Sequence, residues 1–156
     1  MTLQNWFNAY GDLTGSFPES YIVFDCETTG TIFGEKAKYK ECHDLITQIG
    51  HCIVKDRVPV LWDGVILDWT NPEMTKLHEY PETMDQTWLS SSLSRLERIM
   101  ADKGRTYQVP YERMQREGGN PIEMLEAYHK IFADARAEAF FFVGHNAINF
   151  DSKMLG

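Results

Sequence analysis

At 156 residues, with 43% hydrophobic and 24% charged side chains, the chain has the size and composition of one soluble globular domain. Its 15 basic and 23 acidic residues give a net charge of −8, which argues against a protein that coats nucleic acid by charge alone. No apolar run is long enough to span a membrane, and no export signal accompanies the three cysteines. The sequence therefore predicts a cytoplasmic protein with reduced thiols and without a membrane partner.

The first part of the chain predicts a leader and then a strand that carries two acids. Residues 1–19 contain apolar side chains at helical spacing, so a short amphipathic leader helix is expected before the main domain, residues 20–156. The apolar run Tyr21–Phe24 predicts a buried strand, and Asp25 and Glu27 follow it at alternate positions.

These two carboxylates are candidate metal ligands. Alternate residues of a strand share a face, so Asp25 and Glu27 are expected to point the same way, with Cα atoms roughly 6.6 Å apart. Two like charges at that separation repel each other, and a divalent cation with oxygen ligands would relieve the repulsion. A pair of this kind, taken alone, is more often two solvated acids at a strand end. The pair therefore needs a second signal before it indicates a metal site.

Two further strands are predicted after a charged loop. The loop, residues 31–44, contains three lysines that are either solvated or able to contact phosphates. Leu45–Val54 and Val58–Asp68 predict the second and third strands, joined by the short polar link at residues 55–57. The main domain therefore opens with an antiparallel three-stranded meander.

The next segment, at about residues 70–106, predicts a helical insertion. Apolar side chains recur there at helical spacing between Met84 and Met100, and Gly104 ends the pattern. This stripe is typical of a helix that faces a core. We therefore expect an extra helix between the meander and the next unit of the fold.

A helix and then a strand are predicted after the insertion. Pro110–Arg116 predicts a short helix, and Asn120 is placed to cap a second helix that ends near Ala137 and feeds the strand Phe140–Val143. The expected buried stripe of the second helix consists of Ile122, Leu125, Tyr128, Phe132 and Ala135. A meander followed by helix–strand alternation indicates an α/β fold with a mixed sheet.

The last residues offer a third carboxylate. Asn146 is placed to cap a helix that starts at Ala147, and Asp151 would project from an early turn of that helix. That position lies just beyond the end of the preceding predicted strand. Asp151 is therefore expected at the same kind of sheet edge as Asp25 and Glu27.

Two of these stretches, Asp25–Gly30 and His145–Asp151, closely resemble the first and second exonuclease motifs of the DEDD superfamily. These 3′→5′ exonucleases include polymerase proofreading subunits and ribonuclease T-like enzymes. Ile46–Gly50 is similar to the strand that follows the first motif in that superfamily. The resemblance implies a ribonuclease H-like fold and a nucleic acid partner, DNA or RNA, with a free 3′ end. It also implies a polymerase or another replisome component as a partner.

The resemblance further implies a catalytic site. Asp25, Glu27 and Asp151 would hold two Mg²⁺ or Mn²⁺ ions, with Asp25 bridging both ions, Glu27 on the side of the nucleophile and Asp151 on the second ion. The residues that would bind the terminal nucleotide are Thr28, Thr29, Asn146 and Phe150.

The chain departs from the superfamily pattern at its end. The fourth acid of the superfamily lies in a third motif, His-x4-Asp or Tyr-x3-Asp, which this sequence does not contain after Asp151. We therefore expect the C-terminal part of the fold to be missing and the four-acid site to be incomplete in these 156 residues. Two alternatives remain open. One is a nucleic-acid-binding or assembly module with an exonuclease-like fold, and the other is a phosphatase or another two-metal hydrolase.

Overall fold

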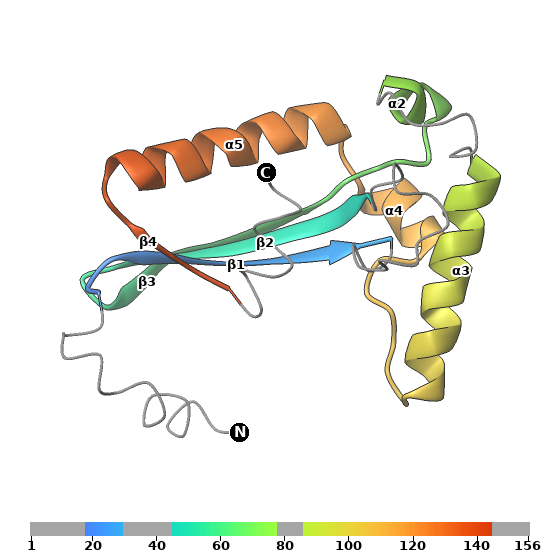
Figure 1. Cartoon of the computed structure of the whole chain (residues 1–156), viewed down its shortest axis with the longest axis horizontal. Coiled ribbons are helices and arrows are strands. Elements are labelled where there is room, and N and C mark those ends of the chain that lie inside the picture. Colours follow the sequence, from blue (N-terminus) through green and yellow to red (C-terminus); the bar gives the residue numbers. More distant parts are fainter. Residues whose placement is uncertain (1–17, 30–44, 78–85, 145–156) are drawn as a thin grey trace, which may run out of the picture.

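A computed structural model describes residues 18–29, 45–77 and 86–144 of the chain, with only the backbone for residues 75–77 (Figure 1). Its elements in chain order are β1 (Tyr21–Thr28), β2 (Ile46–Lys55), β3 (Val58–Ile66), α2 (Pro72–Leu77), α3 (Gln86–Asp102), α4 (Tyr111–Glu117), α5 (Pro121–Ala137) and β4 (Phe141–Val143). Among these residues no helix is long and apolar enough to cross a membrane.

The four strands form one mixed sheet in the order β3-β2-β1-β4. β1 pairs antiparallel with β2, and β2 pairs antiparallel with β3, so the predicted meander is confirmed. β4 returns through α5 and pairs parallel with β1. The expected α/β class with a mixed sheet is therefore confirmed, and β1 occupies a central position with a neighbour on each side.

The two faces of the sheet differ, because helix α5 lies across one of them (Figure 1). On that side the ring of Phe24 packs edge-on against Phe132 of α5, with the ring centroids 5.5 Å apart. We call this side, which carries Ile22, Phe24 and Cys26 of β1, the covered face. The other side, which carries Tyr21, Val23, Asp25 and Glu27 of β1, is called the open face.

The two long helices form where the sequence predicts them. Asn120 caps α5, since its side-chain oxygen accepts a hydrogen bond from the backbone N–H of Ile122 at 3.0 Å. In α3, Leu89 and Leu93 are fully buried, but Ile99 is 40% exposed, so the predicted stripe is wrong at that position. Gly104 follows α3 with φ +66°, a conformation that glycine adopts at little cost.

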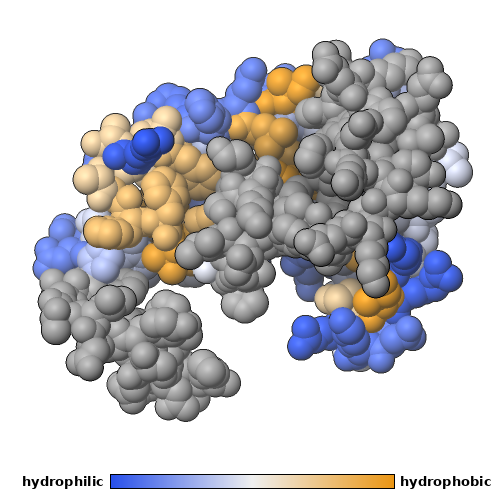
Figure 2. Space-filling view, in the orientation of Figure 1, coloured by the Kyte–Doolittle hydropathy of each residue, from blue (hydrophilic) through white to orange (hydrophobic). Residues whose placement is uncertain are grey.

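The main core lies at the end of the sheet where β1 ends, between the strands and helices α3 and α4. Trp69, Leu89 and Met114 belong to this cluster and are 2% exposed or less. At the other end Figure 2 shows a hydrophobic patch over β4 and the neighbouring end of α5. Phe141 and Phe142 of β4 are 61% and 42% exposed. Burial is therefore concentrated at the end of the sheet towards which Asp25 and Glu27 lie.

Several predictions fall outside the residues that the structure describes. These are the leader helix up to residue 17, the lysine-containing loop at 31–44, and the three site residues Asn146, Phe150 and Asp151. The ends of two strands differ slightly from the predicted ends. β1 continues to Thr28, so both of its acids lie within the strand, and β3 ends at Ile66 instead of Asp68.

Candidate functional site

Asp25 and Glu27 lie on the open face of β1, as their alternate spacing predicts. Their neighbours on either side, Phe24 and Cys26, are both 6% exposed and point to the covered face. Asp25 is exposed and Glu27 is half-buried. The two carboxylates therefore share one side of a central strand, and the side chain of Asp25 is accessible from solvent.

The position beside Asp25 on β2 has no side chain. In the antiparallel register Asp25 is opposite Gly50, and Gly50 is in turn opposite Gly64 of β3. A Cβ atom added at Gly50 would meet no atom within 4 Å, so there is open space above this point of the sheet. A hydrated divalent ion at Asp25 would have room on this side.

Glu27 begins a second row across the same face. It is opposite Gln48 of β2, and Gln48 is opposite Ile66 of β3. Gln48 is half-buried, and its side chain makes no hydrogen bond with the described part of the chain. An amide that can both donate and accept thus lies beside one of the two candidate metal ligands.

The two threonines after the acids are buried and hold the end of β1 in place. Thr29 is fully buried, its N–H donates to the carbonyl of Leu45 at 2.9 Å, and its Oγ1 accepts from the Leu45 N–H at 2.9 Å. Thr28 is 5% exposed, and its carbonyl accepts a hydrogen bond from the Tyr107 hydroxyl at 3.0 Å. These contacts fix where β1 ends. The expected contact of Thr28 and Thr29 with a terminal nucleotide stays a prediction.

Tyr107 holds the ends of two strands together, and the sequence did not reveal this role. Its hydroxyl lies 3.0 Å from the carbonyl of Thr28 and 3.5 Å from the Oγ1 of Thr47. The hydroxyl thereby ties the segment before α4 to the ends of β1 and β2. It lies 79 positions from Thr28 along the chain, and no local pattern signals so distant a contact.

Strand β4 runs towards the same end of the sheet as the two acids. Its parallel register sets Val143 opposite Val23, two residues before Asp25. The chain therefore leaves β4 in the direction of the open-face carboxylates. Asn146, Phe150 and Asp151 follow β4 but lie outside the described residues, so their positions stay predictions. Within the described ranges, no group of three or more His, Cys, Asp or Glu side chains could hold a metal ion together.

The polar residues of the covered face form a separate, buried pair. The Tyr128 hydroxyl donates its one proton to the carbonyl of Ile49 at 3.2 Å, so towards His51 Nδ1, 3.0 Å away, the hydroxyl oxygen is the acceptor. Burial raises the pKa of Tyr128 to about 12 and lowers the pKa of His51, although the nearby Asp63 partly opposes the shift at His51. The imidazole and phenol therefore stay uncharged near neutral pH.

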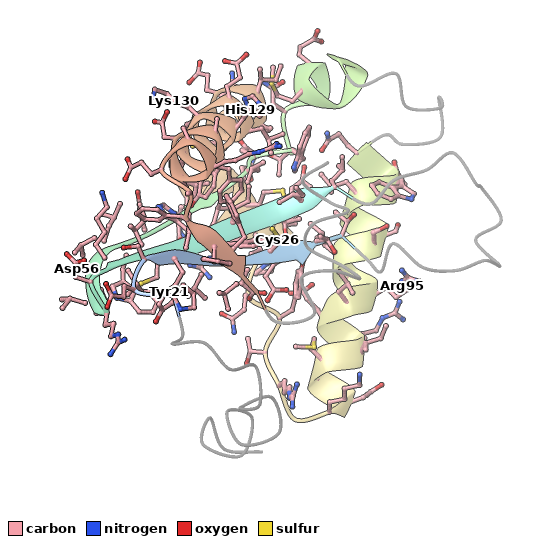
Figure 3. All side chains as sticks on the ribbon, turned by 60° about the vertical axis from the view of Figure 1, so that its left-hand side comes forward. Tyr21, Cys26, Asp56, Arg95, His129 and Lys130 are labelled. Carbon is pink, nitrogen blue, oxygen red and sulfur yellow. The ribbon has the colours of Figure 1, made fainter. Side chains whose placement is uncertain are left out.

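The sheet separates this buried pair from the two acids, because the pair lies on the opposite face. His51 follows Gly50 directly, yet it is opposite Phe24 and lies under α5. On the outer side of the same helix, Figure 3 shows His129 and Lys130 directed away from the sheet. Both are exposed, so His129 is solvated and takes no part in the candidate site.

Carboxylate oxygens are the ligands that Mg²⁺ and Mn²⁺ prefer, so Asp25 and Glu27 fit such an ion by their chemistry. The chain matches no model of a known protein family and no curated protein.

Proposed function

We propose that the chain belongs to a metal-dependent 3′→5′ exonuclease of the DEDD type, which removes terminal nucleotides from single-stranded DNA or RNA. The observation that carries this proposal is that Asp25 and Glu27 share the open face of the central strand, with Asp25 exposed to solvent. These are the two acids of the first exonuclease motif.

The order of the elements supports the same proposal. A ribonuclease H-like sheet, as the resemblance implies it, begins with an antiparallel meander and continues with helix–strand units. The chain has that meander in β1, β2 and β3, and then the unit of α5 and the parallel strand β4. Because β4 runs parallel to β1, the chain leaves β4 towards the end of the sheet where the two acids lie, as a third carboxylate from the second motif requires.

The residues of the site have defined tasks in this reaction. Asp25 and Glu27 would hold the divalent ions through their carboxylate oxygens, with Asp151 as the third ligand from the second motif. When bound, two such ions activate a water molecule and stabilise the leaving oxygen. Tyr107 and Thr29 would keep the end of β1 rigid, so that both carboxylates stay in register with β2.

Manganese binding tests the proposal directly. Titration of the 156-residue chain with Mn²⁺, followed by electron paramagnetic resonance, should show binding that Asp25→Asn weakens by roughly tenfold or more, since that change removes a charged ligand. Asp63→Asn is the matched control, because Asp63 is an exposed acid of the same sheet that is opposite His51 on the covered face. Equal losses in the two variants, or none in Asp25→Asn, would reject the site.

Strand shortening tests the reaction. In the full-length protein, a 5′-labelled single strand should lose nucleotides from its 3′ end in the presence of Mn²⁺, and Asp25→Asn should abolish that loss. A second function, a binding module without hydrolysis, is favoured by the aromatic side chains of the open face. Trp62 and Phe141 are 75% and 61% exposed there, and exposed aromatic rings can stack on bases. Tight binding of the strand without any shortening would support this second function.

A further inference from the structure

A cavity of about 410 Å³ lies at the β3 side of the sheet, bounded also by α4 and the first turn of α5. Its volume is within the range of pockets that hold small organic groups. The residues that matter to its chemistry are Gln48, Gly64, Ile66, Arg113, Glu117 and Met124. Its walls therefore combine apolar side chains with an amide, a guanidinium and a carboxylate.

The charged groups of the cavity are already fixed in position. Arg113 donates from Nε to Glu117 at 2.8 Å and from Nη1 to the carbonyl of Gln108 at 2.6 Å. Hydrogen bonds from Arg113 and Arg116 lower the pKa of Glu117, so its carboxylate stays ionised. An ionised carboxylate repels a phosphate but accepts hydrogen bonds from the edge of a nucleobase. The amide of Gln48 has no hydrogen-bond partner among the described residues, so with Glu117 it makes the cavity fit a base better than a phosphate.

Two rows of paired residues connect this cavity with the candidate metal ligands. One row runs from Asp25 through Gly50 to Gly64, and its last residue lines the cavity. The other starts at Glu27 and reaches the cavity at Gln48. Neighbouring strands are about 4.8 Å apart, so the path from β1 to β3 is about 10 Å long. Stacked nucleotides rise by about 3.4 Å each, and the path therefore has room for about three of them.

The glycine at the middle of the path has no structural explanation. Gly50 lies in a β-strand, where glycine is normally unfavourable, and an added Cβ would meet nothing within 4 Å. Gly64 differs, because its Cβ would lie 3.3 Å from the carbonyl oxygen of Ile49. A bare backbone at Gly50 is explained if another molecule must pass close above the strand.

An exposed indole borders the same path. Trp62 lies two residues before Gly64 on the open face and is 75% exposed. A large aromatic ring left in solvent on a sheet face is a stacking surface for a base, and stacking of this kind tolerates any sequence.

We propose that these features form an extended binding path for a single nucleic acid strand. With its 3′ end at Asp25 and Glu27, the strand crosses β2 at Gly50, stacks one base on Trp62 and places another base in the cavity beside Gln48. The inference rests on the proposed function, because it takes the 3′ end to lie at the two acids. The path predicts that a strand of about five nucleotides binds more tightly than a strand of two.

The dependence of binding on strand length tests this path. Fluorescence anisotropy of the full chain with Mn²⁺ and phosphorothioate oligodeoxythymidylates of two and five nucleotides compares the metal end with the whole path. The five-nucleotide strand should bind at least about fivefold more tightly. Trp62→Ala should abolish most of that gain and leave the affinity for two nucleotides unchanged, whereas Gly50→Val, which fills the space beside Asp25, should weaken the binding of both strands and that of the longer one more.

These variants are expected to fold, because Gly50 has open space above it and Trp62 is 75% exposed; thermal melting checks this. Ser94→Val is the matched control, since it adds an apolar branched side chain at an exposed position of α3 outside the path. If both strands bind equally, or if the two variants do not weaken the longer one, the path is wrong while Mn²⁺ binding at Asp25 still stands. If Asp25→Asn leaves Mn²⁺ binding unchanged, the proposed function fails as well.

Discussion

On the covered face of the sheet, Phe24, Ile49 and His51 are packed under α5, whereas on the open face the same two strands present Asp25 and Gly50. The positions alternate residue by residue along β1 and β2, so both faces are built from one stretch of backbone. These three side chains of the covered face are 6% exposed or less. The open face holds an exposed acid beside a residue without a side chain.

The difference shows how stability and a candidate site can be separated within two strands. Packing under α5 fixes the backbone, and the backbone in turn fixes the direction of the side chains on the other face. Changes at Phe24, Ile49 and His51 should therefore affect folding, and changes at Asp25 and Gly50 should affect binding.

The largest effect on stability should come from removing an aromatic ring under α5. Phe24→Ala deletes a ring that contacts both Phe132 and Phe142, with ring centroids 5.5 and 6.3 Å away. We expect the free energy of unfolding to fall by about 3–5 kcal/mol, because a buried cavity remains. Trp62→Ala on the open face should change it by less than about 1 kcal/mol. Urea denaturation of both variants measures the contrast, and equal losses would remove the distinction between the faces.

A smaller loss should follow when one buried hydroxyl is removed. Tyr128→Phe leaves His51 Nδ1 and the Ile49 carbonyl without their hydrogen-bond partner. We expect a loss of about 1–3 kcal/mol in the free energy of unfolding. Tyr111→Phe is the control, since that hydroxyl donates to Gln86 in a less buried place, and its loss should cost less. A larger loss at Tyr111 would mean that the covered face is not the more sensitive region.

Acid should weaken the covered face through His51. Its Nδ1 proton bonds to Tyr128, and its Nε2 has no hydrogen-bond partner in the described residues, so a second proton there would be buried without an acceptor. Burial lowers the pKa of His51 below the ordinary value of 6.5. At a pH between the lowered pKa of folded His51 and the ordinary pKa of 6.5 in the unfolded chain, the unfolded chain binds more protons than the folded one. The free energy of unfolding therefore falls as the pH drops below about 6.5.

Denaturation midpoints measured across this pH range test the prediction about His51. His51→Phe should flatten the curve in that window, since the titrating group is gone. His129→Phe is the matched control, because His129 is exposed on the outer side of α5. It should leave the slope unchanged, and a slope that depends on His129 instead of His51 would contradict the assignment.

The smallest effect on stability should come from the open face at Gly50, and it should be a gain. Gly50→Ala fills open space and removes the entropic disadvantage of glycine in a strand. We expect the free energy of unfolding to rise by about 0.5–1 kcal/mol. Thermal unfolding detects the change, and a loss of stability would show that the fold itself requires glycine at this position.

Much of the local structure could be predicted because it depends on neighbours in the sequence. Alternation along β1 set Asp25 and Glu27 on one face, and the capping residue Asn120 marked the start of α5. Among the described residues, the apolar stripe predicted for α3 failed only at Ile99, which lies towards the end of the helix. Periodicity gives the apolar side of a helix but not how far along the helix a partner covers it.

The sequence by itself determined which residues alternate on β1, where the helices begin and end, and that two acids share a face. These features follow from backbone geometry and from contacts a few residues apart. The tertiary structure alone decided which face α5 covers, that Tyr107 holds the carbonyl of Thr28 from 79 positions away, and that Asp25, Gly50 and Gly64 form one row. Strand register and helix packing are set by the combined burial and hydrogen bonding of distant segments, and no single segment carries that information.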